Sequence, residues 1–484
     1  MLIGQRLWWI SSAALFASLM ALAPARCQEL RVVEARSDVD PLWEGFRNRL
    51  LPNPPKTTEQ DFGFRPTQHA GGMRAGEIGG VVARSASPAW YAKEIPARTF
   101  ADRLTVSGKF SVLKSEGGSG VMIGWFHEKS RGWRTPNSLA MRINGDGRKY
   151  RLFYEYGTTR GMTGGGGAFE GEMWQTTKTP PFVSDGTVHR WQLDYDPRSA
   201  NEPGQITFRV DDRTYVTDVP LEHKADSATM NRFGIWNVQV PGDELEVFFD
   251  DLIVGDRTET FDADPAWQAQ GNQVKFVDRV RRPYHDFGFQ RSSHAGGQEG
   301  EVGGIVFRDE RPAYYAGPTG KLSLADTLEA SGTLTMLRAA ADSGVLIGWF
   351  DSATKQANET PENERRQRNY LGIVLEGPSR IGHVLRPAYG TSEGPGAVAP
   401  VDDRWRVIRP DASVHRWLLR YDPRGAEGSG RIALTVDGDT KAFELAPGHR
   451  QLGATFDRFG LFNLQTGGHF VEVYLDDLKY TARR

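Results

Sequence analysis

Short stretches in which apolar and polar residues alternate recur along the whole chain. Residues 191–195 (WQLDY) alternate strictly, and residues 206–210 (ITFRV) do so again after the turn at Asp196-Pro197. Residues 121–126 (VMIGWF) are apolar on both faces, as in a strand buried between two layers. No stretch combines a helical period with capping residues. The pattern predicts an all-β protein whose strands pack as a two-sheet sandwich.

The second half of the chain repeats the first half in the same order. Matching segments include 40–43 (DPLW) with 264–267 (DPAW), 69–72 (HAGG) with 294–297 (HAGG), 119–126 (SGVMIGWF) with 343–350 (SGVLIGWF), and 232–239 (RFGIWNVQ) with 458–465 (RFGLFNLQ). The order never changes, which indicates duplication of a whole domain. We expect domain one to span residues 26–255 and domain two residues 256–484, with a boundary near Gly255. Limited proteolysis is expected to cut at 255–262 or in the charged insert 355–368.

The motifs resemble the concanavalin A-like jelly roll, the superfamily of legume lectins, laminin-G-like modules and many polysaccharide-active enzymes. The resemblance is carried by SGVMIGWF, by the Tyr195-Asp196-Pro197 turn, and by RFGIWNVQ followed by EVFFDDL (246–252). It covers both copies almost fully. It implies two tandem concanavalin A-like jelly-roll β-sandwich domains, with ligands on a concave sheet or on loops at one rim.

The N-terminus predicts a secretory signal peptide over residues 1–25. Arg6 supplies a positive charge, residues 7–22 form an apolar stretch, and Ala23-Pro24-Ala25 provides small residues for cleavage. Cys27 follows, but Arg26 stands where a lipoprotein signal needs a small residue. No later apolar run approaches the roughly 20 residues of a membrane helix. We therefore expect a secreted or periplasmic protein with no transmembrane anchor after signal cleavage.

Charge and cysteine content narrow the classes of partner. The chain carries 59 basic and 61 acidic side chains, a balance that provides no footprint for a polyanion such as nucleic acid. Cys27 is the only cysteine, so no disulfide can form within the chain. We expect no nucleic-acid partner and no cofactor.

Amide side chains shared by both copies are candidates for ligand binding. In 232–239, Asn237 and Gln239 share one strand face, and Asn463 and Gln465 repeat the arrangement. Such a pair offers donors and acceptors that suit sugar hydroxyls. The alternative is that these amides hydrogen-bond neighbouring loops.

A second shared cluster combines histidine, glutamate and arginine with paired glycines. His69 and Glu77 lie near one another in the sequence and could act as base and acid, or orient a sugar. Arg84 follows in the same strand and could neutralise an acidic sugar. His294, Glu301 and Arg308 are the counterparts in the second copy. The alternative is structural, because paired glycines also suit a bulge that a polar side chain caps.

Tyr156 and Tyr389 open matching YGT segments and could stack on a sugar face or lie in the core. If the fold supports catalysis, these tyrosines are candidates together with His69, Glu77, His294 and Glu301. We expect each copy to gather one pocket from its shared residues: Asn237, Gln239, His69 and Tyr156 in the first, and Asn463, Gln465, His294 and Tyr389 in the second.

Asp250 and Asp476 open the matching Asp-Asp pairs near the end of each copy. Related sandwiches can hold a structural calcium with such an aspartate, so a calcium ion is a possible ligand here. Calcium needs six to eight oxygen ligands, and neighbouring residues of a strand point to opposite faces.

The resemblance implies either an enzyme or a binding module. Laminarinase-type hydrolases carry an ExDxxE strand, whereas residues 244–250 (ELEVFFD) place the acids in another order. Alginate-lyase-like enzymes have a strand similar to FGIWNVQ, but their catalytic tyrosine position holds Trp236. We therefore favour an exported polysaccharide-binding protein with two glycan-binding modules. A polysaccharide lyase, a glycoside hydrolase, and a purely structural surface or adhesion protein are the alternatives.

Overall fold

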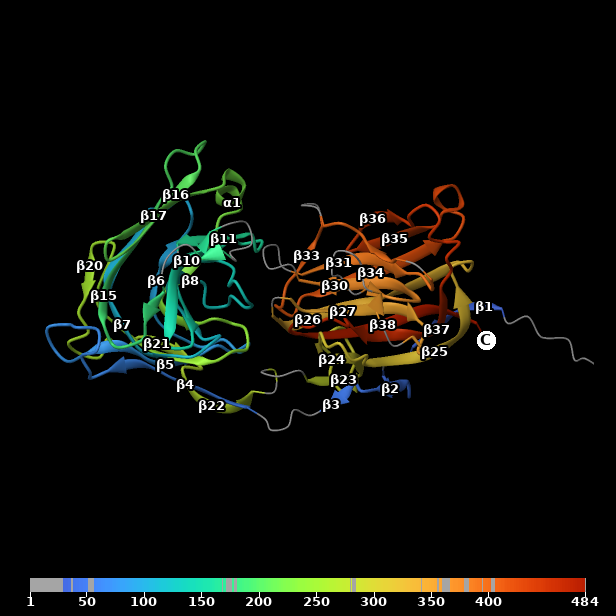
Figure 1. The fold of residues 1–484 in the computed structure, drawn as a ribbon, viewed down its shortest axis with the longest axis horizontal. Coiled ribbons are helices and arrows are strands. Elements are labelled where there is room, and N and C mark those ends of the chain that lie inside the picture. Colours follow the sequence, from blue (N-terminus) through green and yellow to red (C-terminus); the bar gives the residue numbers. More distant parts are fainter. Residues whose placement is uncertain are drawn as a thin grey trace, which may run out of the picture.

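The computed structural model describes residues 29–35, 38–50, 56–167, 169–170, 176–177, 181–278, 280, 284–340, 342–354, 357–358, 366–377, 383–393, 395–401 and 405–483. The predicted signal peptide and Cys27 lie outside these residues, as does most of the charged insert. The described chain forms two β-sandwiches, which lie side by side in Figure 1. All strand pairs in the described chain are antiparallel, and each sheet lies within one sandwich.

The first sandwich consists of two sheets. One contains, in spatial order, β17 (Arg213–Val219), β16 (Gly204–Val210), β15 (Val188–Asp196), β7 (Leu104–Ser115), β19 (Glu244–Val254), β5 (Glu77–Ala83), β4 (Lys56–Arg65) and β22 (Gln273–Asp278), with β20 (Arg257–Glu259) paired to β19. The other contains β11 (Thr163–Gly167), β10 (Lys149–Gly157), β9 (Ser138–Asp146), β8 (Gly120–Phe126), β18 (Met230–Asn237), β6 (Trp90–Arg98) and β21 (Gln268–Gln270), with β14 (Phe182–Val183) paired to β10.

The second sandwich repeats this arrangement. One sheet contains β3 (Arg49–Leu50), β23 (His285–Gln290), β24 (Glu301–Phe307), β38 (Phe470–Arg483), β26 (Leu328–Ala339), β34 (Val414–Asp422), β35 (Arg431–Val436) and β36 (Asp439–Glu444), with β1 (Leu30–Glu34) paired to β38. The other contains β2 (Glu44–Phe46), β25 (Tyr314–Ser323), β37 (Thr455–Asn463), β27 (Gly344–Phe350), β30 (Tyr370–Glu376), β31 (His383–Gly390) and β32 (Ala397–Val398), with β33 (Val407–Ile408) paired to β31.

Few other regular elements occur in the described chain. Two short hairpins are formed by β12 (Phe169–Glu170) with β13 (Thr176–Thr177), and by β28 (Ala357–Asn358) with β29 (Arg366–Gln367). The helical elements are α1 (Leu221–Asp226) and the 3-10 turn η1 (Ala426–Gly428). The predicted all-β class is therefore confirmed.

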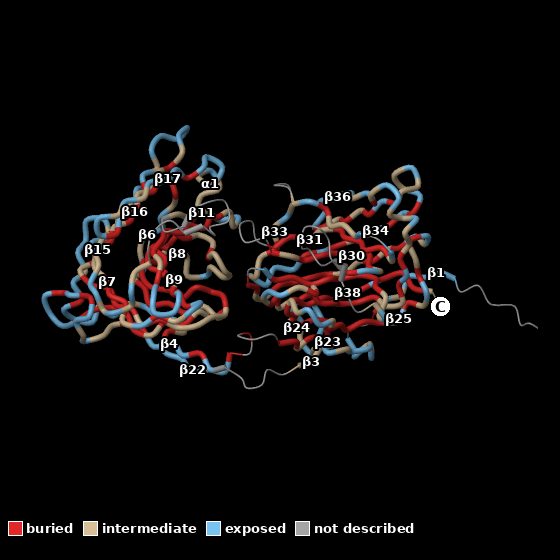
Figure 2. Tube along the Cα trace, in the orientation of Figure 1, coloured by how far each residue is buried: buried red, intermediate tan, exposed pale blue. Residues whose placement is uncertain are grey.

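Each sandwich buries its own apolar core between its two sheets. β8 and β27, the strands predicted to be buried on both faces, are buried at every residue. One side of β8 faces the inter-sheet core through Val121, Ile123 and Trp125. Its other side packs with Trp236 on the outer face of the same sheet. Figure 2 shows buried segments running along the strands of both sandwiches.

The first strands of the chain belong to the second sandwich. β1, β2 and β3, here called the closing strands, pair with β38, β25 and β23. The equivalent strands β20, β21 and β22 instead pair with β19, β6 and β4 of the first sandwich. In Figure 1 the closing strands, in blue, accordingly lie within the red and orange sandwich.

The repeated Asp-Pro-x-Trp motif docks each set of strands. Trp43 packs on Tyr315 with ring centroids 5.7 Å apart, and Trp267 packs on Tyr91 at the same separation. The Tyr315 hydroxyl donates to Asp40 (2.9 Å), as the Tyr91 hydroxyl does to Asp264 (3.4 Å). The two halves of the chain therefore complete the sandwiches by the same contacts.

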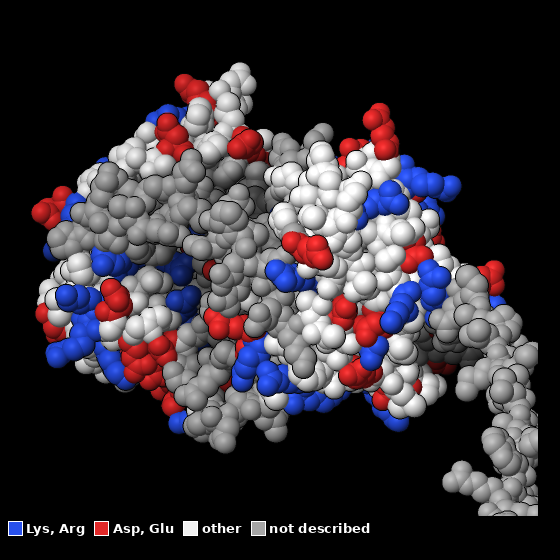
Figure 3. Space-filling view, turned by 45° about the vertical axis from the view of Figure 1, so that its right-hand side comes forward, with Lys and Arg blue, Asp and Glu red and all other residues white. Residues whose placement is uncertain are grey.

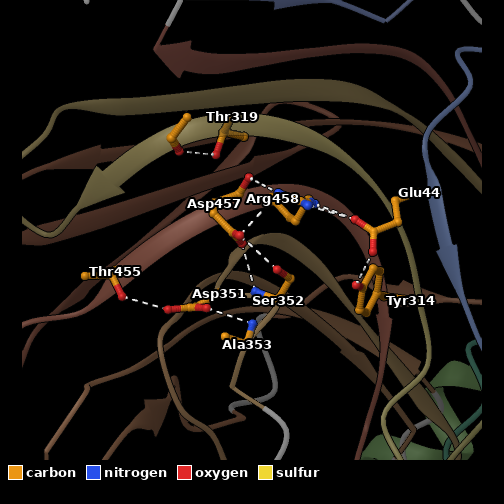
Figure 4. Close-up of polar contacts among 10 residues, drawn as sticks. Glu44, Tyr314, Thr319, Asp351, Ser352, Ala353, Thr455, Asp457 and Arg458 are labelled. Carbon is orange, nitrogen blue, oxygen red and sulfur yellow. Dashed lines mark hydrogen bonds and ion pairs between the residues drawn. The ribbon is translucent and has the colours of Figure 1, made fainter.

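A charged contact adds to the docking of the closing strands (Figure 4). The Glu44 carboxylate accepts hydrogen bonds from Nε and Nη2 of Arg458 (3.0 and 2.8 Å) and from the Tyr314 hydroxyl (2.9 Å). The hydrogen bonds from Arg458 lower the pKa of Glu44 against the opposing effect of burial. Phe46 stacks on the Tyr314 ring at 5.4 Å, so an apolar contact flanks the ion pair.

The strand pairing of the closing strands and of β20 does not match the predicted domain boundary at Gly255. Gly255 has φ +63° in the tight turn between β19 and β20, which pair with each other as a hairpin. The segment 255–262, expected to be a linker, therefore includes a sheet strand. We propose that the structural units are residues 56–278 on one side, and the closing strands with residues 284–483 on the other.

A matched pair of substitutions tests this assignment. We expect Trp43→Ala to destabilise the second sandwich and Trp267→Ala the first, each by about 3 kcal/mol, because each removes a large ring from its docking site. Hydrogen exchange followed by mass spectrometry would locate the lost protection in residues 284–483 and 56–278 respectively. Loss of protection in the first sandwich alone on Trp43→Ala would contradict the assignment.

Candidate functional site

The shared asparagines anchor loops. Asn237 is buried; its Oδ1 accepts from the Ala89 amide (2.9 Å), and its Nδ2 donates to the carbonyls of Ser85 and Ser87 (3.0 Å each). Asn463 makes the equivalent bonds to Ala313, Asp309 and Arg311. Because both amide groups are hydrogen-bonded to the backbone of neighbouring loops, these contacts favour the structural alternative for the two asparagines.

Gln239 also holds a loop, and this loop matters for the site below. Its Oε1 accepts from the Gly132 amide (2.8 Å), and its Nε2 donates to the Ser130 carbonyl (3.4 Å). Gln465, its counterpart, donates to Oε1 of Gln367. Gln239 is thus a positioning residue, in place of the predicted ligand contact.

The His-Ala-Gly-Gly turns are built around a buried glutamate. Glu77 is fully buried and accepts from the Thr67 hydroxyl (2.6 Å) and the amides of His69 and Ala70 (2.9 and 2.7 Å). The His69 ring is exposed and packs on Phe248 at 4.6 Å. In the second copy Glu301 accepts from Ser292 and Ala295, while His294 packs on Tyr474. These contacts favour the structural alternative over an acid and base pair.

Asp250 lies against the first of these turns, and its carboxylate leaves no room for a side chain at Gly72. A Cβ at Gly72 would lie 1.7 Å from Oδ2 of Asp250, and one at Gly296 would lie 1.9 Å from Oδ2 of Asp476. Oδ1 of Asp250 accepts from the Asp251 amide (2.7 Å), and Asp251 pairs with Lys109 (2.6 Å). No group of three or more His, Cys, Asp or Glu side chains is placed to hold a metal ion within the described residues.

The tyrosines lie in the cores. The Tyr156 hydroxyl bonds with Nδ1 of His223 (2.8 Å), and the Tyr389 hydroxyl with Nδ1 of His449 (2.9 Å). Burial raises the pKa of both tyrosines. Tyr156 is on β10, whereas Phe248, on which the His69 ring packs, is on β19 of the opposite sheet. The structure therefore does not bring His69 and Tyr156 into the predicted shared pocket.

Arg84 and Arg308 meet at the junction between the sandwiches. Arg84 donates from Nη1 to the Gly118 carbonyl (3.0 Å), and Arg308 donates to Oγ1 of Thr466. Burial lowers the pKa of His469, and the charges of Arg84 and Arg308 lower it further against Asp342. Burial and the nearby Arg142 also lower the pKa of Arg84, to about 9. These two predicted residues thus share one region, although they come from different sandwiches.

A groove runs along this junction, and we call it the arginine groove. Two cavities, of about 70 and 360 Å³, share Arg131, Gly132, Ala339 and Pro410 in their walls. A Cβ at Gly132 would lie 3.1 Å from Cγ of Pro410, so the two sandwiches touch there. The remaining side chains of interest in the walls are Lys129, Trp133, Arg134, Arg338, Arg409 and Asp411.

Positive charge dominates the arginine groove. Burial lowers the pKa of Arg131 and is the main cause of the lowered pKa of Arg409. The Arg134 guanidinium lies 4.4 Å from the centre of the Trp133 ring and 3.8 Å from Glu155, which also pairs with Arg142 (2.8 Å). One buried carboxylate therefore faces two guanidinium groups beside an indole ring.

The chemistry of this groove suits an anionic, ring-bearing ligand. Arginine can bind a carboxylate through two parallel hydrogen bonds, and an indole offers a flat face to a sugar ring. His383 also lines the groove, but it is buried, bonded to Ser343 (2.8 Å), and burial lowers its pKa to about 4. The sequence carried one signal for this site, the string Arg131-Gly132-Trp133-Arg134, which the second copy does not repeat.

Comparisons with known proteins find similar solved structures but no matching sequence family. No protein-family model and no curated protein sequence matches the chain. Among solved structures, it is similar to the LG4-5 domains of the mouse laminin α1 chain, with 11% identity, 84% of this chain and 90% of that chain covered, and a TM-score of 0.23. An exolytic alginate lyase from Zobellia galactanivorans has 10% identity, coverage of 46% and 98%, and a TM-score of 0.27.

A seed lectin from Lotus tetragonolobus is also similar, with 9% identity, coverage of 41% and 92%, and a TM-score of 0.23. None of the helices in the described part of the chain has the length and apolar character of a membrane span. At sequence identities near 10%, these similarities do not show the function of this chain.

The buried Asp250 leads to a prediction on stability. Burial raises its pKa to about 6, with the charges of Asp251 and Glu77 adding to the effect and Lys109 opposing it. A carboxyl group with a raised pKa in the folded state stabilises the protein only while protonated, so its contribution falls as the pH rises from about 4 to about 6. We expect Asp250→Asn to increase the free energy of unfolding at pH 7 by about 2 kcal/mol and to have little effect at pH 4.

Urea unfolding of both proteins between pH 4 and pH 7 measures this difference. Asp212→Asn, which removes an exposed carboxylate, serves as the control and should show no such pH-dependent gain. A constant effect of Asp250→Asn across this range would show that folding leaves the pKa of Asp250 unchanged, and an effect that turns negative as the pH rises would show that its charge is stabilised; either result would contradict the prediction.

Proposed function

We propose that this protein is an exported polysaccharide-binding protein and that the arginine groove binds an acidic polysaccharide. The observation that carries the proposal is the gathering of Arg131, Arg134 and Arg409 beside Trp133 between the two sandwiches. Its export rests on the signal sequence in residues 1–25.

The balanced total charge predicts no footprint for a polyanion, but the local charge of the groove differs from that of the general surface. Acidic and basic side chains are interspersed on the face seen in Figure 3, in keeping with the nearly balanced totals. In the groove, Asp411 is the one acidic side chain among the described wall residues, against several guanidinium groups. A ligand that brings several carboxylates is favoured there, and a repeating uronic acid polymer has that chemistry.

The groove is also suited to a chain rather than to a single sugar. Residues of both sandwiches line its two cavities, so successive sugar rings can contact both sandwiches. A single sugar in an open groove buries little surface and binds weakly, whereas a longer oligomer adds contacts. Affinity should therefore grow with oligomer length until the groove is full.

Binding is favoured over cleavage by the groups present. The described walls contain no tyrosine, and their one histidine, His383, is held by Ser343 and is neutral at neutral pH. General acid and base catalysis needs groups that exchange protons near the working pH. The arrangement offers charge and a stacking ring, which are the requirements of recognition.

Paired arginine substitutions test the proposal by isothermal titration calorimetry with polygalacturonate. We expect Arg131→Ala with Arg409→Ala to weaken binding at least about 30-fold, because each charged hydrogen bond contributes roughly 1.5 kcal/mol or more. Arg209→Ala with Arg431→Ala removes the same charge from exposed positions on the sheets and should change affinity little.

Three further outcomes would count against the proposal. Carboxyl-reduced polygalacturonate has the same sugar backbone without the charge, so equal affinity for it would contradict binding through arginine. New chain ends after incubation with the polymer would contradict a purely binding role. Absence of binding to every acidic and neutral polysaccharide in a broad panel would leave the structural alternative.

A further inference from the structure

A second pocket, of about 360 Å³, opens at the edge of the first sandwich, near the turn between β19 and β20. Its walls include the aromatic rings of Trp125, Phe233 and Trp267. Trp125 and Phe233 are almost fully buried and contact each other at 5.4 Å between ring centroids. None of its wall residues belongs to the arginine groove.

The second sandwich fills the equivalent space with its own side chain. The register of the sheets makes Tyr480, opposite Ala330, the counterpart of Val254, opposite Val106. The Tyr480 ring stacks on Phe459 with centroids 4.4 Å apart and an angle of 9°, and it meets the edge of Trp43 at 6.0 Å. Phe459 and Trp43 correspond to Phe233 and Trp267. The first sandwich therefore keeps the walls of an aromatic slot but lacks the ring that fills it.

The positions next to this slot also differ between the copies. A Cβ at Gly317 would lie 2.8 Å from the Tyr480 hydroxyl oxygen, so the second sandwich needs glycine there. The first sandwich has Lys93 at the equivalent position, opposite Phe233 in the sheet, and the Lys93 ammonium pairs with Glu259. Lys93 thus lines the open slot with a cationic side chain, which begins at the position that the phenol oxygen approaches in the filled slot.

The slot also contains a hydrogen-bond donor, Nε1 of Trp125, whose counterpart in the second sandwich has an acceptor. In the second sandwich, Nε1 of Trp349 donates to the Thr481 carbonyl (2.9 Å). The counterpart of Thr481 is Gly255, where the chain turns back into β20 instead of continuing. In the part of the chain that the structure describes, Nε1 of Trp125, the counterpart of Trp349, donates no hydrogen bond.

The rim of the pocket is rich in arginine. Arg98 pairs with Asp102 (3.5 Å), whereas Arg103 and Arg257 form no ion pair within the described residues. We propose that this pocket binds a phenolic carboxylate, a ligand that goes beyond the polysaccharide of the proposed function. Its aromatic ring stacks on Phe233 as Tyr480 does on Phe459, an oxygen accepts from Trp125, and the carboxylate faces Lys93 and the two arginines.

Titration of the full-length protein with 4-hydroxybenzoate, followed by calorimetry and tryptophan fluorescence, tests the pocket. We expect one molecule to bind per chain with a Kd of roughly 0.1–1 mM, as suits a ligand of this size. 4-Hydroxybenzyl alcohol, which keeps the phenol but lacks the carboxylate, should bind at least about fivefold more weakly because it loses the charged contacts.

Two variants fill the slot as the second sandwich does. Val254→Tyr and the double variant Lys93→Gly with Val254→Tyr should each weaken 4-hydroxybenzoate binding at least tenfold. Thermal unfolding checks that both remain folded, and their affinity for polygalacturonate should be unchanged. Arg131→Ala with Arg409→Ala is the reciprocal control and should leave 4-hydroxybenzoate binding intact. Absence of binding by the unmodified protein at 5 mM ligand, or equal affinity in both folded variants, would overturn the proposal.

Discussion

The docking of one tryptophan onto one tyrosine in each sandwich is the contact on which the arrangement of the molecule depends. Trp43 and Trp267 hold the last strands of their sheets in place, yet Trp43 comes from the start of the chain and docks on the far sandwich. The chain consequently passes between the sandwiches twice, after Leu50 and after Asp278.

The junction between the sandwiches contains a packed apolar cluster and, beside it, the cavities of the arginine groove. An apolar cluster joins Trp236 and Val238 of the first sandwich to Phe307 and Phe470 of the second. Beside it, the loop held by Gln239 approaches Pro410 and leaves the arginine groove. The groove is thus a product of how the sandwiches are joined, and a single copy of the domain would not contain it.

Alternation and repetition were sufficient to predict the strands and the sandwich class. They could not predict the partner of each strand, because Asp40-Pro41-Leu42-Trp43 and Asp264-Pro265-Ala266-Trp267 are equally able to dock on either tyrosine. Which one docks where depends on chain connection in three dimensions, and strand patterns carry no information on it. The expected boundary at Gly255 therefore fell inside a hairpin.

The ligand-binding residues were also hard to predict from the sequence. Residues shared by both copies, such as Asn237 and Glu77, recur because both sandwiches need the same loops held in the same way. The groups available to ligands lie where the copies differ. Arg131 and Trp133 have no counterparts in the second copy, and Val254 replaces the tyrosine that fills the second slot. Duplicated domains keep their structural residues in common, so differences between copies are the better guide to function.

The central claim is that the two sandwiches form one binding site at their junction. Hydrogen exchange of the protein with and without an acidic oligosaccharide tests it most directly. The account predicts simultaneous protection of the segments 129–134 and 407–412, one from each sandwich. Protection confined to one sandwich, with the other segment unchanged, would contradict it.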